Sequence, residues 1–421
     1  MLPLPSVMRS LFLPALLLSL IAVGARADVT LAAPFQDRAV LQRDKPLPVW
    51  GRAAPGEKVT VEFLGQRIGT TTGADGRWIV YLEPVPAVTT PTTLTVTGQN
   101  TVTLQDILVG EVWLASGQSN MEWSVERSND AAAEIAAAHF PQIREFNATN
   151  TVADQPADTV AGDWQVCSPA TAGRLSAVAY YFARDLHRKL GVPIGILNAT
   201  WGGTPVESWT DLVTLKATAA WPAIDARWQQ AVAEHPERTA NYAAERAAWQ
   251  EAEEKAKATK TKNTAPWPRP PAGPGTPYAL SGLYNGMIAP LQPYALRGAI
   301  WYQGESNWRR ADEYGEVFSA MIRAWRAQWN QGDFPFYFVQ LANFIVKDDE
   351  SGRGWAQLRE AQTKALALPN TGMAVTIDIG DPNDIHPRNK QEVGRRLGLI
   401  ARAKVYDMAV DWSGPVFVGA Q

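Results

Sequence analysis

Cysteine and histidine are both scarce in this chain. Its 421 residues include one cysteine, Cys167, and four histidines. A single cysteine cannot form an intramolecular disulfide, and a lone thiol is most often a small buried hydrophobic side chain, so we expect that role for Cys167. The histidines are scattered, with no H-x-H or H-E-x-x-H pattern. Because metal-dependent deacetylases need clustered His and carboxylate ligands, we expect no metal and no other cofactor.

An excess of charge is also missing. Charged residues make up 19% of the chain and the formal net charge is -3. No strongly basic surface is therefore expected, which argues against nucleic acid as a partner. The chain is 46% hydrophobic, enough for a sizeable core and more than one domain. Nothing in the composition indicates the oligomeric state.

The N-terminus has the three parts of a secretory signal peptide. Arg9 supplies the positive charge, and an apolar run extends from Leu11 to Val23. Ala25-Arg26-Ala27 matches an A-x-A cleavage site. The run is shorter than the ~20 apolar residues of a membrane span. We therefore expect cleavage after Ala27 and a periplasmic or secreted protein with no membrane span.

Residues 28–108 have the pattern of short β-strands. Apolar and polar side chains alternate over Lys58–Leu64, Trp78–Leu82 and Thr92–Gly98. Turn sequences such as Ala54-Pro55-Gly56 separate these runs. We expect an N-terminal β-sandwich that acts as an accessory domain.

From residue 109 to residue 421 strands and helices alternate. Helical spacing of apolar residues follows most of the β-rich runs, which predicts an α/β domain with a parallel sheet and helices on both faces. The expected strands are Val112–Ala115, Ile194–Asn198, Gly298–Tyr302, Phe336–Leu341 and Met373–Ile377. The expected helices are Ala177–Leu190, Tyr314–Trp329, Leu358–Leu368 and Val393–Ala403.

Residues from about 216 to 270 interrupt this alternation. Ala223–Ala258 is rich in helix-forming residues, and a proline-rich connector follows it. We interpret this segment as an inserted helical hairpin closed by a loop. A solvated insertion is the favoured interpretation, and a lid over the site is the alternative.

Short polar segments follow four of the strands. In an open parallel sheet, ligands bind outside the carboxyl ends of the strands, so these segments are expected to meet on one rim. They are Gly117–Asn120, Trp201–Thr204, Gln303–Asn307 and Asp381–Pro387.

Ser119 and His386 are the expected nucleophile and base. A serine needs a neighbouring base to attack at neutral pH, and Ser119 follows a strand on a tight turn. Of the four histidines, only His386 follows a core strand on a polar loop. Asp384 lies two residues before it and could orient the imidazole, with Asp381 as the competing carboxylate.

An ester's tetrahedral intermediate also needs donors for its negative oxygen. Gly202 and Gly203 leave a backbone N–H accessible, and Gln303 offers a side-chain amide. Together with the Ser119 N–H they form the expected oxyanion hole.

Five segments resemble bacterial sialate O-acetylesterase-like proteins of the SGNH hydrolase superfamily. The resemblance covers roughly residues 30–421, and the order of the segments makes it specific. The segments are WLASGQSNMEW (113–123), WGGTPVESW (201–209), GLYNGMIAPL (282–291), WYQGESN (301–307) and DIHPRNK (384–390).

This resemblance implies a flavodoxin-like three-layer domain in which Ser119 and His386 are catalytic. It places the oxyanion glycine on the Gly202–Gly203 pair and puts Gln303 where the superfamily usually has asparagine. Two features depart from the family. The usual acid position, three residues before the histidine, is Asn383. A Ser–His dyad is therefore an alternative to a triad with Asp384. Relatives also continue into a further β-rich segment, so this chain is interpreted as a candidate fragment.

These features predict an exported esterase that removes O-acetyl groups from sugars such as sialate, xylan or xyloglucan. The expected substrate-binding side chains flank the catalytic ones and are Gln118, Asn120, Glu305, Asn307 and Arg309. The main alternative is a non-catalytic carbohydrate-binding remnant of a longer esterase. A peptidase or lipase is disfavoured because the chain lacks a G-x-S-x-G elbow.

Overall fold

In the computed structural model of this protein, residues 28–265, 267–415 and 419 are described. The signal peptide expected over residues 1–27 lies outside these ranges. Within them, no helix is both long enough and apolar enough to cross a membrane.

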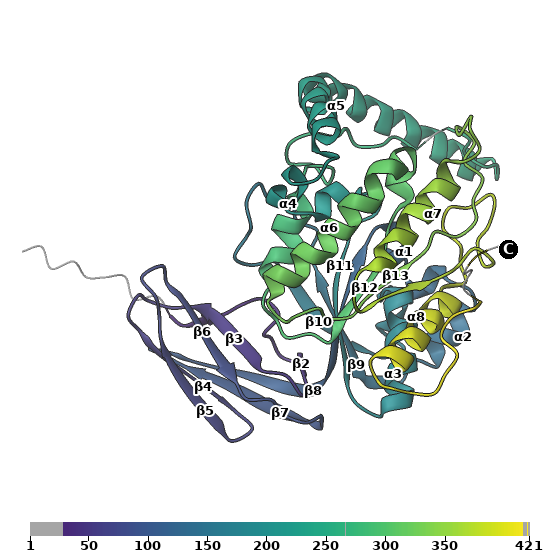
Figure 1. The fold of residues 1–421 in the computed structure, drawn as a ribbon. Coiled ribbons are helices and arrows are strands. Elements are labelled where there is room, and N and C mark those ends of the chain that lie inside the picture. The colour runs from purple at the N-terminus through teal and green to yellow at the C-terminus, as the bar shows by residue number, and fades with distance from the viewer. Residues whose placement is uncertain (1–27, 266, 416–418, 420–421) are drawn as a thin grey trace, which may run out of the picture.

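A mostly parallel sheet forms the centre of the molecule, with strand order β10-β9-β11-β8-β12-β13-β14 (Figure 1). All neighbouring pairs from β9 to β14 are parallel, and only β10 pairs antiparallel, at one edge. The strands are β8 (Thr101–Gly117), β9 (Phe140–Ala148), β10 (Gly162–Cys167), β11 (Ile194–Thr200), β12 (Gly298–Tyr302), β13 (Phe336–Val339) and β14 (Thr371–Ala374). The prediction of a parallel sheet is confirmed for these inner strands.

Two strands on one side of the sheet, and the bounds of a third, differ from the prediction. β9 and β10 were not predicted, because charged side chains such as Arg144 and Glu145 interrupt their apolar pattern. Both side chains are nonetheless buried. β14 ends at Ala374 rather than Ile377, since the chain turns away once Thr376 donates its hydroxyl proton to the Gln340 carbonyl.

Helices cover both faces of this sheet. Trp113 of β8 packs on Phe182 of α3 (Ala177–Leu190), which also contacts α8 (Lys390–Lys404). Trp301 of β12 points the other way and packs on Phe318 and Trp325 of α6 (Ala311–Trp329), beside α7 (Gly354–Lys364). Three of the four predicted helices are therefore confirmed to within a turn at their ends, whereas α7 begins and ends four residues before the predicted Leu358–Leu368.

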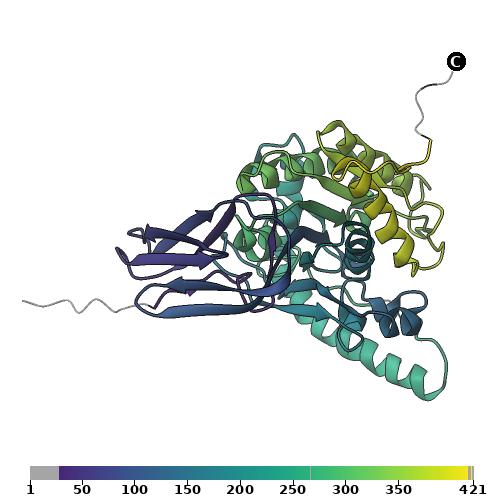
Figure 2. The ribbon, with the colours of Figure 1, turned by 90° about the horizontal axis from the view of Figure 1, so that it is seen from below.

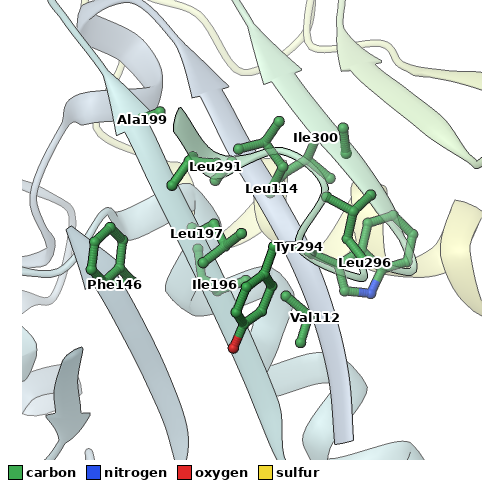
Figure 3. Close-up of a cluster of buried hydrophobic side chains, with 14 of the residues drawn as sticks. Val112, Leu114, Phe146, Ile196, Leu197, Ala199, Leu291, Tyr294, Leu296 and Ile300 are labelled. Atoms are coloured by element: carbon green, nitrogen blue, oxygen red, sulfur yellow. The ribbon is translucent and has the colours of Figure 1, made fainter. Parts of the chain in front are cut away.

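The core continues from the sheet into the segment that precedes β12. Figure 3 shows side chains of β8 and β11 meeting Leu291, Tyr294 and Leu296 of that segment. Tyr294 is fully buried, and its hydroxyl donates to the Val40 carbonyl at 2.8 Å. The same core therefore extends toward the N-terminal strands.

The N-terminal strands join the central sheet through one long strand. β1, β3 and β6 form a separate three-stranded sheet, whereas β4 pairs with β5 and β7, and β2 and β7 pair with β8. Their bounds are β1 (Thr30–Leu31), β2 (Val40–Gln42), β3 (Leu47–Arg52), β4 (Lys58–Phe63), β5 (Gln66–Thr71), β6 (Arg77–Leu82) and β7 (Val88–Thr97). The domain boundary expected between residues 108 and 109 falls inside β8, which the views of Figures 1 and 2 show running from one part into the other.

The segment from 216 to 270 contains one helix where a hairpin was expected. α5 (Trp221–Ala258) runs for 38 residues, includes Pro236, and extends away from the sheet (Figure 2). The prediction of two helices was wrong because no turn sequence divides the run. In the described residues 259–265 and 267–270 the return segment forms neither helix nor strand, and Trp249 Nε1 donates to the Ala265 carbonyl at 3.1 Å. The remaining short helices are α1 (Ser119–Glu122), α2 (Ala131–Ala136) and α4 (Leu212–Lys216).

Candidate active site

A glycine at the end of β8 begins the candidate site. Gly117 has φ +135°, and a Cβ there would lie 2.2 Å from the Tyr302 carbonyl oxygen of β12. Only glycine allows this approach without strain. Gln118 then donates its N–H to the same carbonyl at 3.0 Å, and Ser119 begins α1. The turn between β8 and α1 therefore holds Ser119 at the carboxyl end of the sheet.

Ser119 and His386 are in direct hydrogen-bonding contact. The distance from Ser119 Oγ to His386 Nε2 is 2.8 Å, although 267 residues separate them in the chain. Both side chains are partly buried. Trp123 stacks on the imidazole, with ring centroids 4.9 Å apart and planes 18° apart. The contact is of the kind a serine needs for activation by a histidine.

The electrostatic surroundings keep the imidazole neutral. Burial is the main cause that lowers the pKa of His386 to about 4, and the cations Lys390 and Arg127 lower it further. Asp384 opposes them by raising it. A histidine with this pKa is unprotonated at neutral pH and can accept the serine proton.

The two candidate carboxylates occupy different positions. Asp384 Oδ1 accepts the His386 backbone N–H at 2.9 Å and lies 3.8 Å from Nδ1 of the ring. Asp381 Oδ1 accepts the Asn383 backbone N–H at 2.8 Å. Asp384 therefore faces the imidazole, whereas Asp381 supports the preceding turn.

A buried polar network lies behind the histidine loop. Lys390 Nζ donates to Asn120 Oδ1, and Asn120 Nδ2 donates to Glu305 and, at 3.0 Å, to the Ile385 carbonyl. Burial lowers the pKa of Lys390 to about 7 and raises that of Glu305. The network thus fixes the residue next to His386 relative to the residue next to Ser119.

Gly202 lies against Ser119 at the end of β11. A Cβ on Gly202 would come within 3.3 Å of Ser119 Cβ. Its N–H donates to Glu122 Oε2 at 2.8 Å. Gly203 follows in a left-handed conformation, with φ +78°, and is exposed. The geometry brings Gly202 closer to the serine than its neighbour.

Gln303 is turned away from the serine and is fully buried. Its Nε2 donates to the Thr204 carbonyl at 3.2 Å and to Asn307 Oδ1 at 2.7 Å. Asn307 Oδ1 also accepts the Val206 N–H at 3.0 Å, which fixes the direction of both amides. Both amide protons of Gln303 are therefore engaged within the protein.

Most of the expected substrate-binding side chains are also inside the protein. Gln118, Asn120, Glu305 and Asn307 are each at most 5% exposed. Gln118 Oε1 accepts from the N–H groups of Gly304 and Ser306, joining the loops after β8 and β12. These side chains therefore have little exposed surface with which to contact a sugar. Arg309 differs, because it is exposed and stacks on Trp308 at 4.4 Å.

Four side chains near the serine were not singled out from the sequence: Glu122, Trp123, Arg127 and Lys390. Three of them lie within the motif segments around Ser119 and His386, and Arg127 stacks on Trp123 at 3.6 Å. The only sequence feature that could have pointed to these three residues was their position in the motif segments. Their contacts depend on how the two segments meet, which the sequence does not show.

No metal-binding cluster adjoins Ser119 in the described part of the chain. No group of three or more His, Cys, Asp or Glu residues there could hold a metal ion. A cavity of about 1130 Å³ lies elsewhere, between the outer face of β3 and β6 and the segments 284–293 and 328–331. None of the candidate catalytic residues lines it. Cys167 is buried, and burial raises its pKa to about 12, as expected for a structural thiol.

Comparison with known proteins gives matches over nearly the whole chain. The sequence profile described as carbohydrate esterase, sialic acid-specific acetylesterase, matches residues 279–402. Sialate O-acetylesterase of Rattus norvegicus is 32% identical over 441 residues, covering 95% of this chain and 78% of the relative. The Homo sapiens enzyme is 30% identical over 452 residues, covering 98% and 77%. A crystal structure of a carbohydrate acetylesterase from Xanthomonas citri superimposes with a TM-score of 0.78 at 39% identity, covering 94% of this chain and 79% of that one.

Proposed function

This chain belongs to the sialate O-acetylesterase family and is a carboxylic ester hydrolase, and from that premise we propose a serine mechanism for it. It removes O-acetyl groups from sugars, either sialate or plant cell-wall glycans such as xyloglucan or xylan, through an acetyl-serine intermediate. The 2.8 Å contact between Ser119 Oγ and His386 Nε2 is the observation that supports this proposal most directly.

The proposed reaction has two acyl-transfer steps. His386 Nε2 takes the Ser119 proton as Oγ attacks the acetyl carbonyl, and the imidazolium then protonates the departing sugar hydroxyl. Water attacks the acetyl-serine in the second step, with His386 again as the base. Asp384 supports the imidazolium by its negative charge and by its bond to the His386 backbone.

The oxyanion is proposed to bind backbone donors next to the serine. Ser119 is the first residue of α1, where N–H groups lack intrahelical acceptors, and Gly202 lies against it. Gly203 is the alternative glycine donor. Gln303 joins these donors only if its amide releases Thr204 or Asn307, so we propose that it acts mainly by positioning the loop after β11.

Acetate release with a Ser119→Ala control tests the mechanism. The substrates are an aryl acetate, O-acetylated sialic acid, acetylated xylan and acetylated xyloglucan oligosaccharides. We expect release from the aryl acetate and at least one glycan, loss of at least about 10³-fold in the variant, and no effect of a chelator.

The outcomes separate the proposals. Equal release by both proteins would overturn the role of Ser119, and loss of activity on chelation would indicate a metal-dependent reaction. Binding of glycans without any release would favour the carbohydrate-binding remnant. The preferred glycan identifies the natural substrate class.

Three further proposals concern the rest of the chain. We propose that residues 1–27 direct export to the periplasm or outside the cell and are removed after Ala27. Residues 28–108 are proposed to form a β-sandwich accessory domain, supported by their antiparallel strand pairs. The helical segment 216–270 is proposed to be a solvated insertion, since α5 has few buried residues.

A further inference from the structure

The Gly202 N–H, whose residue packs against the nucleophile, already has an acceptor. Gly202 donates its backbone N–H to Glu122 Oε2 at 2.8 Å. Glu122 is the last residue of α1, three positions after Ser119. A carboxylate oxygen therefore lies at the donor that the proposed mechanism assigns to the substrate.

This oxygen takes the position that an acetyl oxygen needs. An oxyanion donor must lie 2.7–3.1 Å from the oxygen that becomes negative. Gly202 packs against Ser119, so its N–H is within reach of the carbonyl oxygen of an acetyl group bound at Ser119 Oγ. Glu122 Oε2 and that oxygen compete for one donor.

Electrostatics adds to this competition. A carboxylate and a developing oxyanion repel each other when they lie within hydrogen-bonding distance of the same donor. The carboxylate must therefore leave the donor before the tetrahedral intermediate forms.

We propose that Glu122 closes the oxyanion site of the resting enzyme and that the acetyl carbonyl of the substrate displaces it. This inference rests on the proposed serine mechanism. In this proposal Glu122 is a positioning residue. A substrate whose carbonyl oxygen is a weak hydrogen-bond acceptor displaces it from the Gly202 N–H less readily.

The surroundings of Glu122 allow this movement. The residue is exposed, and its carboxylate interacts with the Gly202 N–H and the Asn150 side chain. No Lys, Arg or His nitrogen within the described ranges lies within 4.0 Å of it. Arg127, on the same side of the site, is exposed and has a favourable charge interaction with Glu122. The Arg127 guanidinium lies over the Trp123 ring and can receive the carboxylate when it turns away from Gly202.

A reversible boronic acid tests the proposal, because its tetrahedral adduct with the nucleophilic serine places an oxygen in the oxyanion site. We expect Glu122→Ala to bind the boronic acid about ten-fold more tightly than wild type, since a hydrogen bond to a charged acceptor no longer has to be broken. Glu122→Gln keeps the shape but not the charge and should fall between the two. kcat/KM for an aryl acetate, which has no sugar to contact, should rise in the same order.

Glu126→Gln is the matched control. It removes a negative charge four residues away, where the side chain contacts Ser124 Oγ at 3.4 Å and not Gly202. The proposal is overturned if both Glu122 variants match wild type, if both lose activity, or if Glu126→Gln shows the same gain. Failure of the serine mechanism itself would look different, because then wild type would neither bind the boronic acid nor depend on Ser119.

Discussion

At the scale of single residues, the base of the candidate site is tuned by its neighbours. Burial, Lys390 and Arg127 together lower the pKa of His386 to about 4. The proposed mechanism requires the neutral imidazole, so it predicts that kcat/KM falls only as the pH drops through about 4. Most histidines, by comparison, titrate near 6.5.

Replacing Arg127 should move this acidic limit upward. Arg127→Gln removes a cation that disfavours the imidazolium, so the pKa of His386 rises and the variant loses activity at a higher pH than wild type. The measurement is kcat/KM for an aryl acetate between pH 3.5 and 8. Arg188→Gln is the control, because Arg188 also stacks on an aromatic ring, that of Phe140 at 5.1 Å. If kcat/KM of Arg127→Gln falls at the same acidic pH as wild type, Arg127 does not lower the pKa of His386.

The choice between the two carboxylates can also be tested residue by residue. Asp384→Asn should lower kcat/KM, but by less than the roughly 10⁴-fold found when a carboxylate is hydrogen-bonded to the base, since Asp384 lies 3.8 Å from Nδ1. Asp381→Asn should have a smaller effect, because Asp381 contacts only the turn. Equal activity of Asp384→Asn and wild type would favour a Ser–His dyad.

At the scale of elements, a buried carboxyl joins two strands and a helix. Glu145 of β9 accepts from Asn198 Nδ2 of β11 at 3.0 Å and from the Ser176 N–H, at the start of α3, at 3.4 Å. Burial raises the pKa of Glu145 to about 7. Between pH 4.5 and 7 the folded protein therefore holds a proton that the unfolded chain has released.

This proton uptake makes the protein less stable as the pH rises from 4.5 to 7. Glu145→Gln removes the titration and keeps an oxygen that accepts from Asn198. We expect the variant to be more stable than wild type at pH 8, by up to about 3 kcal/mol, and to differ little at pH 4.5. Denaturant unfolding at the two pH values measures this, and an equal difference at both would show that Glu145 does not titrate as described.

Elements with a regular spacing of apolar residues were predictable from the sequence. Elements whose polar residues are hydrogen-bonded by distant segments were not. The apolar spacing of Ala177–Leu190 predicted α3 with both bounds correct. β9 was missed because Glu145 interrupts its apolar pattern, and only Asn198 and Ser176, distant in sequence, satisfy that carboxyl. The hairpin expected within α5 was wrong because helical propensity alone does not show where a polar helix reverses.

At the scale of the whole molecule, β8 connects the N-terminal strands to the candidate site. Its N-terminal part pairs with β7, and its C-terminal part lies between β11 and β12. Glu111, in the middle of β8, is fully buried and receives hydrogen bonds from Arg43 at 2.5 Å and Arg297 at 2.7 Å. The strand that precedes Ser119 is therefore held by contacts with the N-terminal strands and with the central sheet.

The sequence by itself determined the family, the inner parallel strands and the pair formed by Ser119 and His386. The strands and Ser119 could be placed from local order, because a polar segment directly after an apolar strand lies at the carboxyl end of the sheet. The family and His386 followed from the order of the motif segments along the chain. Tertiary structure alone decided that Gln303 points inward, that Asp384 rather than Asp381 faces the imidazole, and that Glu122 occupies the Gly202 N–H. These outcomes depend on side-chain hydrogen bonds between segments up to about 270 residues apart in the chain, and on which groups the fold buries.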